Sequence, residues 1–331
     1  MIIAVDAAGG EYAPHEIVKG AIRAAREYEV EIALVGRKEI LRVLAGRYIG
    51  KLGIKIIDAS QNIGSDESPI EAVHSKPDSS IVVGTNLVRD GLASAFVSAG
   101  NTGAIFYSAL VSLGKIKGIE RPAIGSLISI NSVVPVLLID AGANADCRPK
   151  HLVQFAQLGS TYIREIFGID SPSVSLLNNG EEETKGNRLA RESYQLLKKT
   201  KLNFLGNIEG QDMLTGKANV IVTDGFTGNI VLKTIEGLSA TWLYSLGQVG
   251  QIFSKAYSLS SRASDRGIGM DSWSKRLDYR ESGGSYLLGV NGNIIKAHGR
   301  SRAKAIKNAI GLAKQAVERG ICERIKEESY E

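Results

Sequence analysis

The sequence predicts an α/β fold with three layers, in which helices cover both faces of a mostly parallel sheet. Short apolar runs alternate with segments whose apolar residues recur at helical spacing, a pattern typical of βαβ units. The chain has 331 residues, of which 44% are hydrophobic, so it is long enough to bury a large core. We therefore expect a single two-lobed α/β unit over residues 1–331, with a ligand crevice at the carboxyl ends of its strands.

The predicted strands are short runs rich in Ile, Val, Leu and Ala that end near Gly, Asn or Asp. They lie at residues 2–5, 32–35, 54–57, 95–97, 123–130, 134–139, 174–177, 203–205, 220–222, 286–290 and 293–296. The last two flank Asn291 and Gly292, a dipeptide typical of tight turns. These two strands are therefore expected to form a β-hairpin.

The predicted helices carry apolar residues three and four positions apart. They span residues 14–27, 38–48, 79–90, 104–113, 152–167 and 301–319, and another begins near residue 227. Pro14 suits the first turn of its helix, and Ser79 or Ser80 is expected to cap another. The polar segment at residues 60–76 is predicted to be an irregular loop.

The net charge of +5 and the pI near 9.0 are only mildly basic. They do not indicate a nucleic-acid partner, but they suit an acidic protein or an anionic membrane surface. The only cysteines, Cys147 and Cys322, have no CxxC spacing, which indicates neither a disulfide framework nor a zinc site. No signal peptide or membrane-spanning run is recognised, so we expect a cytoplasmic protein or one attached to the membrane surface.

The first candidate site is the turn SAGNTG at residues 98–103, between a predicted strand and a predicted helix. A helix N-terminus attracts anions because its first N–H groups are unpaired and the helix dipole favours negative charge. Gly100 and Gly103 would let a ligand approach the backbone, and Asn101 and Thr102 add donors. The turn is neither a P-loop nor a dinucleotide fingerprint, so by itself it indicates only an anion site.

A second turn of this kind follows the predicted strand at residues 220–222. The segment VSAGNTGAI at residues 97–105 aligns with VTDGFTGNI at residues 222–230. Internal duplication and ordinary strand-to-helix turn chemistry explain this likeness equally well. In either case, two helix N-termini could face one cleft.

The segment DAGANAD at residues 140–146 also follows a predicted strand. Asp140, Asn144 and Asp146 could bind a cation, orient a nucleophile or hydrogen-bond a polar substrate. The same residue types are also common as turn and cap formers, so a purely structural role stays open.

The segment NNGEEETKGN at residues 178–187 is the most polar in the chain. Its acidic residues suit the start of a helix, whereas its position after a strand and its Lys185 suit an anionic ligand. His298, after the last predicted strand, could act as an acid or simply pack. Both segments are therefore candidate parts of a site.

Residues 238–276 have a different character. Apolar residues fall on one helical face, and a mixed apolar and basic stretch follows. We expect a projecting helical hairpin that packs in the core or a dimer, or that inserts near anionic lipid.

Seven stretches occur in the order found in a known family and cover nearly the whole chain. They are AVDAAGGEYAP, VSAGNTGA, IDAGANADCRPKHLVQFA, LLNNGEEETKGN, FLGNIEGQD, VTDGFTGNIVLKTIEG and LLGVNGNIIKAHGRSRAKAIKNAI. With them the chain resembles the phosphate acyltransferases of bacterial phospholipid synthesis, which use acyl-acyl carrier protein and inorganic phosphate. Ala8 stands where Met is common, Glu11 where Asp is common, and residues 238–276 match the family only weakly.

The resemblance implies a fold like isocitrate and isopropylmalate dehydrogenases and phosphotransacetylase, in a homodimer. It also implies peripheral attachment to the inner face of the cytoplasmic membrane through the hairpin. The implied reaction moves a fatty acyl group from acyl carrier protein to phosphate, and acyl phosphate then feeds glycerophospholipid synthesis. A membrane-bound glycerol-3-phosphate acyltransferase is a further implied partner, and no cofactor or metal is expected.

This reaction requires phosphate donors, donors to the thioester carbonyl and a proton for the leaving thiolate. The candidate catalytic residues are Lys185, Asn229 and His298. The candidate phosphate- and substrate-binding residues are Gly100, Asn101, Thr102, Gly103, Asp140, Asn144, Glu181, Asp224 and Thr227. Phosphate is already a nucleophile at neutral pH, so no Ser–His–Asp triad is needed, and no nucleophile elbow is found.

Three other functions are compatible with parts of the sequence. A phosphotransacetylase-like enzyme would use short acyl-CoA as the donor. A metal- and NAD-dependent hydroxy acid dehydrogenase would need Asp140, Asp146 and Asp224 as metal ligands, but the dinucleotide fingerprint is missing. A non-catalytic membrane scaffold would rest on the hairpin alone.

Overall fold

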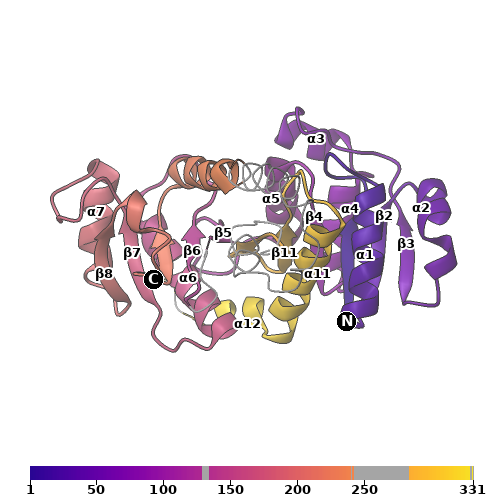
Figure 1. The fold of residues 1–331 in the computed structure, drawn as a ribbon. Helices are drawn as coiled ribbons and strands as arrows, with labels where there is room; N and C mark the ends of the chain where they lie inside the picture. Colours follow the sequence, from indigo (N-terminus) through magenta and orange to yellow (C-terminus); the bar gives the residue numbers. More distant parts are fainter. Residues whose placement is uncertain (129–133, 240, 242–282, 329, 331) are drawn as a thin grey trace, which may run out of the picture.

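A computed structural model describes residues 1–128, 134–239, 241, 283–328 and 330 (Figure 1). The helical hairpin predicted at residues 238–276 therefore lies almost entirely outside the described residues. Within the described part, no helix is long and apolar enough to cross a membrane.

The described residues form one sheet of 11 strands. In chain order these are β1 (Ile2–Asp6), β2 (Glu31–Gly36), β3 (Ile54–Asp58), β4 (Ala95–Ser98), β5 (Ala123–Leu127), β6 (Leu137–Ile139), β7 (Ser173–Leu177), β8 (Asn203–Ile208), β9 (Val220–Val222), β10 (Ser285–Leu288) and β11 (Asn293–Lys296). Their order across the sheet is β3-β2-β1-β4-β11-β10-β5-β6-β9-β7-β8. The predicted strands are thus confirmed, with ends shifted by a few residues.

The sheet consists of two parallel blocks joined by antiparallel strands. Strands β3, β2, β1, β4 and β11 run parallel to one another, and so do β6, β9, β7 and β8. Between the blocks, β10 and β5 are each antiparallel to both neighbours, and β10 forms the predicted hairpin with β11. The sheet is therefore mixed but mostly parallel. Strands β1, β4 and β11 are neighbours, and their carboxyl ends lie side by side.

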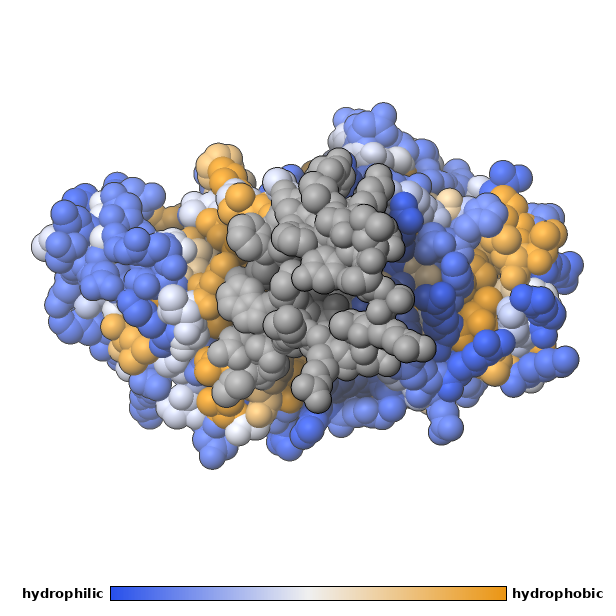
Figure 2. Space-filling view, viewed as in Figure 1, coloured by the Kyte–Doolittle hydropathy of each residue, from blue (hydrophilic) through white to orange (hydrophobic). Residues whose placement is uncertain are grey.

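Helices cover both faces of the sheet. On one face lie α1 (His15–Tyr28), α2 (Lys38–Ala45), α6 (Pro149–Phe167), α7 (Arg188–Leu197), α11 (Ala303–Glu318) and α12 (Ile321–Glu327). On the other lie α3 (Pro69–Ser75), α4 (Ser80–Arg89), α5 (Thr102–Leu113) and a helix at residues 225–239. Figure 2 shows that mainly hydrophilic residues cover the end of the molecule that carries α7 and β8.

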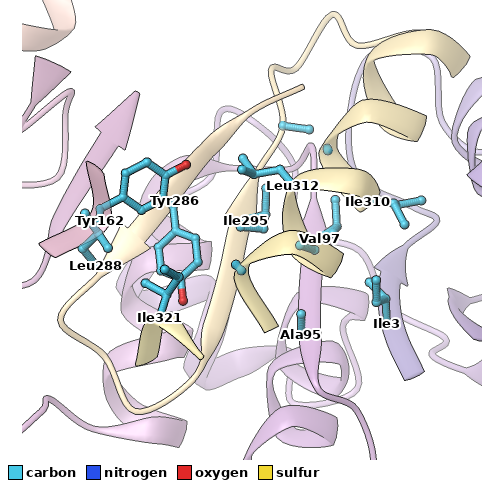
Figure 3. Close-up of a cluster of buried hydrophobic side chains, with 14 of the residues drawn as sticks. Ile3, Ala95, Val97, Tyr162, Tyr286, Leu288, Ile295, Ile310, Leu312 and Ile321 are labelled. Atoms are coloured by element: carbon cyan, nitrogen blue, oxygen red, sulfur yellow. The ribbon is translucent and has the colours of Figure 1, made fainter. Parts of the chain in front are cut away.

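Strand alternation explains this layering. In β1, Ile3 and Val5 face α1 and α11, whereas Ala4 between them faces the opposite layer. Figure 3 shows part of the apolar cluster between the sheet and the layer that contains α1, α6 and α11. In it, Tyr286 of β10 packs on Tyr162 of α6 with ring centroids 5.9 Å apart. Burial raises the pKa of both tyrosines, so they stay neutral. The two parallel blocks thus share one apolar cluster.

Three local predictions are corrected. The segment predicted as an irregular loop contains α3, and Ser79 at the start of α4 makes no side-chain capping hydrogen bond. The acidic residues 181–183 do not enter a helix: α7 begins later, at Arg188, and Asn187 caps it by accepting a hydrogen bond from Ala190 N–H at 2.8 Å. The acidic cluster is therefore part of a loop.

Candidate functional site

A central pocket of about 540 Å³ lies where β1, β4 and β11 end. The loops that follow these strands line it, together with residues 62–65, residues 141–142 after β6 and one side of the helix at residues 225–239. Segments from both parallel blocks therefore meet in this pocket. Of the predicted site residues, it is lined by Gly100, Asn101, Thr102, Gly103, Asn229 and His298.

The N-terminus of α5 forms one wall of the central pocket. Asn101 caps the helix, because its Oδ1 accepts a hydrogen bond from Ala104 N–H at 3.1 Å. Its Nδ2 donates to the carbonyl oxygens of Gly64 at 3.1 Å and Glu67 at 3.2 Å, so the side chain is committed to holding that loop. Among the described residues, the backbone N–H groups of Asn101, Thr102 and Gly103 have no partner. These three amides, rather than the Asn101 side chain, are free to bind an anion.

A buried network holds this turn in place. Ser98 Oγ donates to Asp6 Oδ2 at 2.6 Å and accepts from Gly100 N–H at 3.0 Å. Asp6 Oδ1 accepts from Ala8 N–H and Gly9 N–H, both at 3.0 Å. Burial raises the pKa of Asp6, and these hydrogen bonds oppose that rise. A Cβ on Gly9 would come within 2.3 Å of Asp6 Oδ2, so only glycine fits between the two turns.

Two lysines bring positive charge to the central pocket. Lys296 is the last residue of β11 and lies opposite Ser98 in the strand register. Burial lowers the pKa of Lys296, the negative charge of Glu236 opposes this shift, and the charge of Lys233 on the helix at residues 225–239 adds to it. Within the described part of the chain, neither ammonium group has a hydrogen-bond or ion-pair partner. Glu236 supplies part of the counter-charge, and an anion in the pocket would add to it.

Sequence reasoning missed both lysines. Lys296 ends an apolar strand, and Lys233 is one of several polar residues on a helix, so neither stood out. Lys296 reaches the site because β11 ends beside β4. This neighbourhood depends on the strand order, which the sequence pattern does not reveal.

His298 follows β11 and faces the helix at residues 225–239. Its Nε2 lies 3.1 Å from Glu236 Oε2, and its Nδ1 accepts a hydrogen bond from Arg300 N–H at 3.1 Å. In the neutral form of the ring, Nδ1 accepts this N–H and the proton is on Nε2, directed at Glu236. Both His298 and Glu236 line the central pocket.

The second glycine turn does not repeat the first. Asp224 Oδ1 accepts from Thr227 N–H at 2.9 Å, and Asp224 Oδ2 accepts from Thr227 Oγ1 at 2.8 Å. The helix N-terminus is therefore already occupied by a carboxylate of the protein. Asp224 and Thr227 line a separate outer pocket of about 380 Å³, beside Asn178 and Asn187, whereas Asn229 lines the central pocket.

Asp140 and Asn144 are buried and do not line either pocket. Asp140 accepts hydrogen bonds from the N–H groups of Ile124, Gly142, Ala143 and Asn144 and from Asn144 Nδ2, at 2.7–3.1 Å. Burial raises the pKa of Asp140, while these donors favour its carboxylate form. Asn144 Nδ2 also donates to Pro122 O at 2.8 Å. In this structure both side chains hold the loop after β6, which presents residues 141–142 to the central pocket.

Glu181 and Lys185 lie exposed in the loop at residues 178–187 and do not line the central pocket. Glu181 Oε1 is 3.9 Å from Lys217 Nζ. Asn178 Nδ2 donates to Lys185 O at 3.1 Å, which closes the loop on itself. The structure thus separates these two predicted residues from the turn at residues 98–103.

Cys147 is not suited to act as a nucleophile. Burial, with Asp140 nearby, raises the pKa of the Cys147 thiol to about 12, so the reactive thiolate is scarce. Among the described residues, no group of three or more His, Cys, Asp or Glu side chains is placed to hold a metal ion.

Comparison with known proteins decides the family. A family model described as "Fatty acid synthesis protein" matches residues 1–324. The phosphate acyltransferase of Dehalococcoides mccartyi is 54% identical over 328 residues, which make up 99% of this chain and 94% of that protein. The chain belongs to the phosphate acyltransferase family. The enzyme of Desulforamulus reducens is 48% identical and covers 98% of this chain and 96% of its own. The predicted family is therefore confirmed: the chain is an acyltransferase of fatty acid and phospholipid synthesis.

Solved structures share the fold of this phosphate acyltransferase at low sequence identity. The EutD phosphotransacetylase from Staphylococcus aureus superposes with a TM-score of 0.59 at 16% identity, covering 95% of this chain and 94% of that one. A protein from Salmonella typhimurium described as a 4-hydroxythreonine-4-phosphate dehydrogenase gives 0.53 at 13% identity, covering 95% and 99%. The predicted α/β fold with a large, mostly parallel sheet is thus confirmed.

Proposed function

We propose that this enzyme transfers the acyl group of acyl-acyl carrier protein to inorganic phosphate in the central pocket. One observation carries the proposal: three unpartnered N–H groups at the start of α5 share a pocket with Lys296 and Lys233. A dianion suits this combination of donors and charge. Phosphate is the attacking substrate of the family reaction.

In the proposed reaction, a phosphate oxygen attacks the thioester carbonyl carbon and a tetrahedral oxyanion forms. The C–S bond then breaks, giving acyl phosphate and the thiol of the carrier protein once the thiolate gains a proton. Holding phosphate on the amides of α5 restricts its orientation relative to the thioester. Asn229 lines the pocket from the helix at residues 225–239 and is our proposed donor to the oxyanion.

His298 is the proposed proton donor to the leaving thiolate, because it lines the pocket beside Glu236. In this step the doubly protonated ring gives one proton to the thiolate and returns to the neutral imidazole. Lys185 remains a second proposed donor to the thioester. It reaches the substrate only if the loop at residues 178–187 contacts the acyl carrier in the complex. Asp140, Asn144 and Asp224 support the loops, and Thr227 and Glu181 would serve only a substrate group bound near the outer pocket.

A trapping assay tests the function. The protein is incubated with palmitoyl-acyl carrier protein with and without phosphate, and hydroxylamine converts any acyl phosphate to a hydroxamate. The proposal requires a hydroxamate that depends on phosphate. If no such product forms with carrier proteins loaded with several chain lengths, the function is wrong.

The same assay with acetyl-CoA and palmitoyl-CoA tests the phosphotransacetylase-like alternative. Turnover with acetyl-CoA but not with acyl carrier protein would favour that alternative. The fold likeness to the S. aureus enzyme does not decide between donors, because at 16% identity it concerns the fold alone.

We also propose the finer features that the resemblance implies. These are a two-lobed dehydrogenase-like unit, a homodimer, and a cytoplasmic enzyme at the membrane surface close to the acyltransferase that consumes its product. Light scattering during gel filtration tests the dimer, and flotation with anionic liposomes tests membrane attachment.

A further inference from the structure

One surface of the enzyme is rich in basic side chains, of which Arg300, Lys307 and Lys314 pair with nearby glutamates. Between residues 291 and 317 the chain has six Lys and Arg residues and no Asp or Glu: Lys296, Arg300, Arg302, Lys304, Lys307 and Lys314. All but Lys296 lie on α11 or in the loop that leads into it. This segment carries a charge of +6, whereas the whole enzyme carries only +5. Positive charge is therefore concentrated in this part of the chain.

Helix α1 adds its own positive charge to this surface. Arg23 and Arg26 of α1 and Lys304 and Lys307 of α11 line a groove of about 440 Å³, which also contains Glu27. The one acid is neutralised, because Lys307 Nζ lies 2.8 Å from Glu27 Oε1. Arg23 is exposed and has no ion-pair partner in the described part of the chain. In Figure 2, hydrophilic residues predominate over α1, beside the grey atoms.

A series of neighbouring residues runs from the central pocket to the groove. Glu11, at the rim of the pocket, forms an ion pair with Arg300 at 3.3 Å. Arg302 follows and stacks on Tyr12, with Cζ 4.6 Å from the ring centroid. Lys304 lies in the first turn of α11, so Lys307 is only about 4.5 Å further along the helix axis. Basic side chains thus extend from the pocket rim to the groove.

We propose that the α1–α11 groove docks an acidic surface of the acyl carrier protein and so directs the acyl thioester into the central pocket. This inference rests on the proposed function, in which the carrier is the one protein substrate. Opposite charges around a binding site accelerate encounter and fix orientation. The row of basic residues from Arg300 to Lys307 suits a carrier that stays docked while its flexible arm delivers the thioester.

Charge reversal in the full-length enzyme tests the docking surface. The variant is Arg23→Glu with Arg26→Glu, and the matched control is Lys199→Glu with Lys201→Glu, two exposed lysines beyond α7 with the same change in net charge. We expect the KM for palmitoyl-acyl carrier protein to rise about tenfold in the groove variant and to stay within about twofold in the control. Added salt should weaken binding of the native enzyme and narrow the difference.

Two further readouts make the outcome decisive. A small thioester, palmitoyl-pantetheine, should lose no more activity in the groove variant than in the control. Equal loss with both substrates, or no change in the KM for the carrier, would overturn the docking site. Biolayer interferometry with apo-carrier protein measures docking without turnover, so a failed trapping assay would not be confused with a failed docking site. Loss of binding to phosphatidylglycerol vesicles but not to the carrier would assign the groove to a membrane surface instead and refute the proposal.

Discussion

His298 Nε2 lies 3.1 Å from Glu236 Oε2, and this contact joins the loop after β11 to the helix at residues 225–239 across the central pocket. The two residues come from opposite blocks of the sheet. The contact therefore both orients the imidazole and holds the two sides of the pocket at a defined separation.

The first prediction concerns proton transfer from His298. His298→Ala should lower kcat with acyl carrier protein by about 100-fold, because the leaving thiolate loses its proton donor. With an aryl thioester, whose thiol is acidic enough to leave unprotonated, the loss should nearly vanish. An equal loss with both substrates would show that His298 only positions the pocket.

The second prediction concerns Lys296 and phosphate. Lys296→Met should raise the KM for phosphate by about 10- to 100-fold, because a charge-assisted hydrogen bond to the anion is lost. The KM for the carrier protein should change little. Lys201→Met, at an exposed site far from the pocket, is the control. An unchanged phosphate KM in Lys296→Met would remove this lysine from the site.

The lowered pKa of Lys296 also predicts an effect on stability. The folded protein holds this proton less tightly than the unfolded chain does, so the buried charge costs stability at pH values below both pKa values. Lys296→Met should therefore unfold at a higher temperature at neutral pH in phosphate-free buffer. The gain should shrink as the pH rises from the lowered pKa toward the ordinary value of about 10.4. Phosphate should stabilise the native enzyme more than the variant.

The third prediction concerns Lys185. The sequence makes it a candidate catalytic residue, but in the structure it does not line the central pocket. If the exposed loop at residues 178–187 reaches the bound thioester, Lys185→Ala should lower kcat about 100-fold while the unfolding temperature stays unchanged. Lys199→Ala, an exposed lysine on the same side of the molecule, serves as the control. Native kcat in Lys185→Ala would leave Asn229 as the proposed oxyanion donor.

The fourth prediction concerns the loop after β6. Asp140→Asn places an NH₂ group against N–H donors and should lower the free energy of unfolding by about 2–4 kcal/mol. Asp146→Asn, at an exposed position in the same loop, should change it by less than about 0.5 kcal/mol. Urea unfolding of both variants measures the difference. Equal stability would mean that Asp140 does not hold the loop.

The fold was predictable because its strands and helices have clear periods. Alternation of apolar runs indicated the parallel blocks, and Asn291 with Gly292 indicated the hairpin. The strand order was not predictable, since it depends on long-range pairing such as β11 against β4. The helix α3 was missed because it is only seven residues long, too short to show a helical repeat, and follows a polar segment.

The candidate site was predictable only in part, for a related reason. A glycine turn before a helix indicates an anion site, but not whether its donors are free. The amides at residues 101–103 are free, whereas after Asp224 the N–H of Gly225 donates to Asn144 O and that of Thr227 to the Asp224 carboxylate. Asp140 attracted attention as a polar residue at a strand end, yet its oxygens are used by the protein itself. Residue type and spacing do not reveal such internal pairing.

The most direct test is a crystal structure of the enzyme with inorganic phosphate. The account predicts a phosphate ion within hydrogen-bond distance of the N–H groups of Thr102 and Gly103, with Lys296 Nζ beside it. Phosphate bound in the outer pocket near Asp224, with the central pocket empty, would contradict it.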